Sequence, residues 1–157
     1  MHSLAVTAGF AGLRTVCSGG VLGAWAPSIE LVEDPRGIID LPPGFSYHVF
    51  SKVGEEMDDG FFVPALHDGM GAFPGPRGTT ILVRNHEISP LDTRLGPWGW
   101  TNERLPRVDP KKIYDQGGSC PLLGGCTTLI YDTTKRELVQ HALSLTGTVH
   151  NCAGGTT

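Results

Sequence analysis

The chain has 157 residues, of which 22 are glycine and 12 are proline, and its formal net charge is −4 at pH 7. The length suits one ordinary domain, but this share of glycine and proline disfavours long helices. Acidic and basic residues are mixed, and no basic stripe is present that would neutralise phosphates along a duplex, so nucleic acid is excluded as a partner. The β-branched and aromatic residues cluster in short runs, which predicts an all-β protein with long glycine/proline-rich loops.

The N-terminal segment is predicted to be an export signal. Residues 4–26 are small and mildly apolar and are interrupted by Arg14, which is too weak a pattern for a stable membrane span. Ala24-Trp25-Ala26 has the small-x-small form of a cleavage site, but the charged start of a signal peptide is missing. Either the true start lies upstream or the segment is a poor buried helix.

Twin-arginine signals contain a mild, alanine- and glycine-rich apolar region of this kind. We therefore interpret residues 1–26 as a truncated twin-arginine signal. Such a signal would engage the twin-arginine export machinery and place the mature chain in the periplasm or outside the cell.

Two strands are expected before residue 65. Residues 45–50 follow the turn Pro42-Pro43-Gly44, and Phe45, Tyr47 and Val49 alternate onto one face, which predicts a strand. Residues 61–63 follow a turn and are ended by a proline, which predicts a short or edge strand.

Two hairpins are expected farther along the chain. The glycine-rich segment 67–73 and the run 79–85 flank a turn at residues 74–78. The clearest hairpin joins residues 127–132 to residues 137–145 through the turn 133–136. Short strands in hairpins with polar tips fit propeller blades as well as sandwiches, and no internal repeat decides between these folds.

Residues 88–125 contain five prolines and little periodicity, and they are too many for an ordinary connector. Loops of this length usually carry function or are ordered by another element. Cys120 and Cys126 enclose a flexible segment short enough to permit a disulfide, and the alternative is two thiols without a role.

His86 and Glu87 are candidate metal ligands because they end a predicted strand, where a sheet opens into a loop. Glutamate offers a hard oxygen for calcium, and histidine prefers transition metals. An ordinary hydrogen-bonded pair is the alternative. His67-Asp68-Gly69-Met70 poses the same choice, and its Asp-Gly step favours a tight turn.

Cys152 is a candidate ligand in the glycine-rich stretch that follows the last predicted strand. A soft thiolate selects iron, copper or zinc, whereas a nucleophilic thiol would need a base beside it. His150 is two residues away and would share its face in an extended segment. A structural cysteine is the alternative.

Taken together, these segments resemble the PhoX-type alkaline phosphatase family, whose members are exported through the twin-arginine route. The similarity runs from about residue 29 to the end. The segments that carry it are Asp40 to Tyr47, His67-Asp68-Gly69-Met70, Leu82-Val83-Arg84-Asn85-His86-Glu87, Gly125 to Asp132, and Gly147 to Gly155.

The resemblance implies a β-propeller whose centre holds iron and calcium, with a cysteine thiolate on iron, glutamates on the metals and an arginine facing the phosphate. It matches Cys152 to a family metal ligand and places Glu87 and His86 in a family motif without fixing their roles. The substrate it implies is a small-molecule phosphate ester.

The family's Thr-Cys-Glu-Glu motif does not follow Asn151-Cys152-Ala153-Gly154 in this sequence. We therefore expect residues 27–157 to be the N-terminal part of a PhoX-like propeller, with one or two blades of about six, and to be inactive alone. The alternative function is a non-catalytic, exported, propeller-like binding or scaffold protein.

Overall fold

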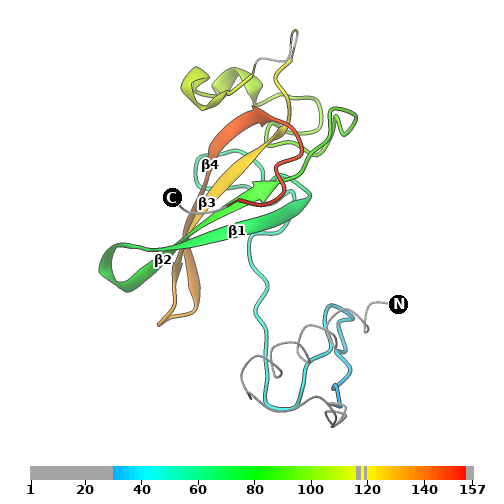
Figure 1. Ribbon diagram of the computed structural model, residues 1–157, viewed down its shortest axis with the longest axis vertical. Helices are drawn as coiled ribbons and strands as arrows, with labels where there is room; N and C mark the ends of the chain where they lie inside the picture. The colour runs from blue at the N-terminus through cyan, green and yellow to red at the C-terminus, as the bar shows by residue number, and fades with distance from the viewer. Residues whose placement is uncertain (1–29, 116–117, 119, 155–157) are drawn as a thin grey trace, which may run out of the picture. The chain divides into compact units, whose positions relative to one another are not determined.

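The computed structural model describes residues 30–115, 118 and 120–154 (Figure 1). The predicted export signal at residues 1–26 lies outside these ranges. The chain divides into two compact units, Met1–His48 and Val49–Thr157, and each is described by itself. Within the described ranges, no helix is long and apolar enough to cross a membrane.

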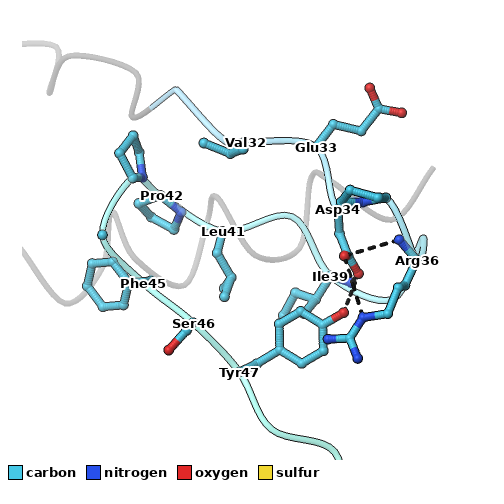
Figure 2. A pocket seen from close by; sticks show the side chains of 13 residues that line it. Val32, Glu33, Asp34, Arg36, Ile39, Leu41, Pro42, Phe45, Ser46 and Tyr47 are labelled. Atoms are coloured by element: carbon cyan, nitrogen blue, oxygen red, sulfur yellow. Dashed lines mark hydrogen bonds and ion pairs between the residues drawn. The ribbon is translucent and has the colours of Figure 1, made fainter.

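The described part of the first unit is an irregular loop organised around Asp34. The Asp34 carboxylate accepts the backbone N–H of Ile38 at 2.9 Å. It also accepts the backbone N–H of Arg36 at 3.2 Å and a hydrogen bond from the Tyr47 hydroxyl (Figure 2). The Tyr47 hydrogen bond is the main reason that the pKa of Asp34 is lowered to about 2. Residues of this loop, from Val32 to Tyr47, line an open hollow of about 360 Å³ (Figure 2).

The predicted strand at residues 45–50 is wrong, because none of these residues joins a sheet. Phe45 is 63% exposed, and Phe50 stacks on Tyr131 with ring centroids 4.9 Å apart. Alternating apolar residues favour an extended chain, but a strand also needs a neighbouring chain that supplies hydrogen bonds. Residues 61–63 form only one isolated bridge, between Glu56 and Phe62, in place of the short strand expected.

The second unit contains one antiparallel sheet in the order β1-β2-β3-β4, and both predicted hairpins are confirmed (Figure 1). The described part of the chain is thus all-β with almost no helix. The strands and short 3-10 helices are β1 (His67–Pro74), η1 (Pro76–Gly78), β2 (Thr79–His86), η2 (Leu105–Arg107), η3 (Pro110–Lys112), β3 (Gly124–Asp132) and β4 (Glu137–Thr148).

The hydrophobic core of the second unit lies between one face of the sheet and the segments that precede β1 and follow β2, which cover that face. It consists of six buried side chains, of which the loop 88–125 contributes two. These are Met57, Phe61, Val63, Trp98, Val108 and Leu143. Described residues of the long loop therefore form part of the core.

Aspartates cover the outer edge of β4. The Asp58 carboxylate accepts the backbone N–H of His141 at 2.7 Å, and the Asp59 carboxylate accepts that of Leu143 at 2.7 Å. These bonds occupy donors that would otherwise be open to a strand of another molecule, so this edge is protected against such pairing.

Candidate metal site

The candidate site lies where β1 begins and β2 ends. Asp68 is the second residue of β1, and Glu87 directly follows β2. The first paired residues of these antiparallel strands are His67 and His86, so Asp68 and Glu87 flank the same end of the ladder. The backbone N–H of Glu87 donates to the Leu66 carbonyl at 2.9 Å, which fixes Glu87 beside the start of β1.

Cys152 reaches the same place because the chain reverses after β4. Gly147 and His150 have φ values of +83° and +52°, which turn the backbone back toward the sheet. The segment after β4 then runs beside β1 (Figure 1), and the N–H of Gly69 donates to the Cys152 carbonyl at 2.9 Å. The N–H of His150 donates to the Ile88 carbonyl at 3.2 Å and ties the turn to the end of β2.

Asp68, Glu87 and Cys152 come together at this point. Each offers one ligand atom, and these three atoms lie within 4.8 Å of one another. The Cys152 thiol donates to Glu87 Oε1 at 3.4 Å. That hydrogen bond, together with the carboxylate charge, raises the pKa of the Cys152 thiol. Asp68 and Cys152 are exposed, and Glu87 is half-buried, so the group opens to solvent.

His86 belongs to the interior and is not brought into this group. Its side chain is fully buried, and its two ring nitrogens contact the Ala65 carbonyl at 3.0 Å and the Thr127 hydroxyl at 2.9 Å. Adjacent residues of a strand point to opposite faces, and His86 is on the covered one. Burial lowers its pKa to about 4, so the ring is neutral at pH 7. The structure therefore does not bring the His86 side chain together with Asp68, Glu87 and Cys152.

Replacing Thr127 by valine is expected to destabilise the protein by about 1–3 kcal/mol, because a buried nitrogen of His86 loses its hydrogen-bond partner. Thr128→Val is the matched control, since Thr128 is only half-buried and contacts Ser144 on the opposite face. Urea unfolding of the two variants measures the difference. Equal midpoints would show that the His86 hydrogen bond contributes nothing.

The remaining candidates lie outside the group. His150 is exposed at the turn and is not among the three clustered residues. Cys120 and Cys126 are free thiols, so the disulfide that their spacing permits is absent between these two described residues. Cys126 lies within β3, and Cys120 lies near Asn102, with 3.7 Å between the Cys120 sulfur and the Asn102 side-chain nitrogen.

Asp68 was predicted to serve a tight turn, but it belongs to β1. The ladder has an irregularity between His67 and Met70, and the Gly69 N–H donates to the Asp68 carboxylate at 2.6 Å. A local Asp-Gly contact of this kind explains the turn-like sequence. Two features of the sequence point to Asp68 as a ligand. It lies in one of the family-like segments, and the hairpin predicted for that segment pairs it with the strand that directly precedes Glu87.

A small groove lies next to the group. It has a volume of about 170 Å³ and is lined by residues of β1, of β2 and of the returning segment. Gly69, Asn85 and Gly154 are among them. The site is thus a solvent-open set of two carboxylates and one thiol beside a groove, and these are donor types that metal ions use.

The chain matches the family model described as "Alkaline phosphatase PhoX" over residues 27–138. Because this match covers more than half of the 157 residues, the chain belongs to the PhoX alkaline phosphatase family. The matched range includes Asp68 and Glu87, and Cys152 lies beyond its end. No curated protein and no solved structure matches the chain.

Proposed function

We propose that Asp68, Glu87 and Cys152 form part of the metal centre of a phosphatase that hydrolyses small-molecule phosphate monoesters. The observation that carries this proposal is the convergence of three ligand atoms, within 4.8 Å of one another, from three separate segments. Membership of the PhoX alkaline phosphatase family gives the reaction class.

The donor chemistry fits iron and calcium, the metals that the resemblance implies. Carboxylate oxygens of Asp68 and Glu87 are hard donors that suit calcium, and the Cys152 thiolate is a soft donor that suits iron. Bound metal ions would act as Lewis acids on a phosphate oxygen. In the structure, Glu87 Oε1 accepts a hydrogen bond from the Cys152 thiol, and this bond holds the two side chains together.

Three side-chain donors are too few for a complete centre of this kind, because calcium alone takes six to eight oxygen ligands. We therefore propose that this sequence supplies one wall of the site and is inactive alone. The sheet β1-β2-β3-β4 would be one blade of a propeller of about six, since a four-stranded antiparallel sheet is the unit of such a blade.

Residues 1–26 would be a twin-arginine signal segment, and residues 27–157 would belong to a PhoX-like propeller domain. In this proposal the mature protein is periplasmic or extracellular.

Cobalt(II) is a suitable probe of the centre because a cobalt–thiolate bond gives a charge-transfer absorption band. We expect this band when the reduced wild-type chain is titrated with Co²⁺ without oxygen, and no band in Cys152→Ala. Cys120→Ala is the matched control, because Cys120 is also a free thiol but lies near Asn102. A band of equal strength in Cys152→Ala, or no band in the wild type, would contradict the proposal.

A further inference from the structure

Two hydrogen bonds hold the backbone of Cys152, one from a backbone donor and one from a side-chain donor. Its carbonyl accepts the Gly69 N–H at 2.9 Å and the side-chain amide N–H of Asn85 at 3.2 Å. Two donors on one carbonyl restrain the orientation of the peptide unit that follows Cys152. The thiol is one side-chain torsion away from that backbone, so these bonds also restrain where the sulfur lies.

The Asn85 amide is itself oriented from its other side. The Cys126 thiol donates to Asn85 Oδ1 at 3.1 Å, which points the amide nitrogen toward Cys152. Asn85 and Cys126 are paired residues of neighbouring strands, so their side chains lie on the same face of the sheet. Asn151 contributes a longer contact, 3.7 Å from its amide nitrogen to the Cys126 sulfur.

Strand alternation explains why Asn85 reaches the Cys152 carbonyl and His86 does not. Asn85 lies on the face that the returning segment crosses, whereas His86 points into the covered face and is fully buried. Asn85 also lines the groove beside the three clustered ligand atoms. It therefore contacts the segment that carries Cys152 without contributing a ligand atom to the group.

We propose that Asn85 is a positioning residue of the metal centre, and that Cys126 orients it. The inference rests on the proposed function, because it concerns the sulfur ligand of that site. Partners that orient metal ligands typically change metal affinity by 10–100-fold when they are removed. The role assigned to Cys126 is hydrogen-bond donation to an amide rather than ligation.

The test compares Co²⁺ affinity and the cobalt–thiolate band in three forms of the reduced chain. Asn85→Leu keeps a similar volume and adds no charge but removes the donor to Cys152, and we expect about tenfold weaker Co²⁺ binding with a shifted band. Cys126→Ser keeps a donor for Asn85 Oδ1, and we expect affinity and band close to those of the wild type. The melting temperature of each metal-free form is measured alongside.

A purely structural role for Asn85 would lower the melting temperature and leave the affinity and the band of the folded Asn85→Leu protein unchanged, and this result would overturn the inference. If Asn85→Leu does not fold, Cys126→Ala decides: it removes the donor that orients Asn85, and wild-type affinity in that variant would overturn the inference. A wild-type chain with no cobalt–thiolate band would instead remove the proposed centre itself.

Discussion

Replacing Gly69 by alanine is expected to weaken metal binding by about a hundredfold, because it pushes Cys152 away from Asp68 and Glu87. A Cβ at position 69 would lie 2.8 Å from the Cys152 carbonyl oxygen and 3.0 Å from Ala153 Cα. Both of these are backbone atoms, so the returning segment must move and the bond from the Gly69 N–H is strained. Co²⁺ titration of the variant measures the loss.

Gly154→Ala is the matched control for this substitution. Gly154 belongs to the same returning segment, but a Cβ at that position meets nothing within 4 Å. We expect Co²⁺ binding of Gly154→Ala to equal that of the wild type. Unchanged binding in Gly69→Ala would show that the close approach of β1 and the returning segment does not set the site.

Replacing Trp98 by alanine is expected to destabilise the second unit by about 3–5 kcal/mol, which is enough to unfold a marginally stable domain. Trp98 has no exposed surface and lies in the hydrophobic core, although it belongs to the long loop. The substitution removes the largest buried side chain of the described residues and leaves a cavity. Thermal unfolding followed by circular dichroism measures the effect.

Trp98→Phe separates loss of packing from loss of the indole N–H. The buried indole nitrogen of Trp98 has no hydrogen-bond partner among the described residues, so removing it carries no hydrogen-bond penalty. We expect Trp98→Phe to lose clearly less stability than Trp98→Ala. If Trp98→Ala melts at the wild-type temperature, the long loop does not contribute to the core as described.

Local sequence pattern predicted the two hairpins because each contains runs of strand-forming residues on both sides of a recognisable turn. The same reasoning failed for residues 45–50, where the pattern is good but no neighbouring chain pairs with it. Pairing depends on contacts between distant segments, and no local pattern contains that information. For the same reason the core role of Trp98 could not be predicted from a loop with little periodicity.

The candidate site was predictable in part. Glu87 and Cys152 stood out because their residue types suit metal ions and because they lie next to predicted strands. Asp68 was assigned to a turn, since Asp-Gly is also a turn sequence. Its place beside Glu87 depends on the β1–β2 register, and the approach of Cys152 depends on the backbone reversal at Gly147 and His150.

His86 shows the limit of reading neighbouring residues as one motif. It stands next to Glu87 in the sequence, but strand alternation sends its side chain into the covered face. Asn85 could have been identified by the same alternation, because it stands two residues before Glu87. An amide is a weaker signal than an imidazole or a carboxylate in a search for metal ligands.

X-ray absorption at the cobalt edge of the cobalt-loaded wild-type chain tests the central claim most directly, because it identifies the atoms bound to the metal. The proposed centre predicts one sulfur together with oxygen neighbours, and loss of the sulfur in Cys152→Ala. Cobalt bound only by oxygen and nitrogen in the wild type would contradict a centre built from Asp68, Glu87 and Cys152.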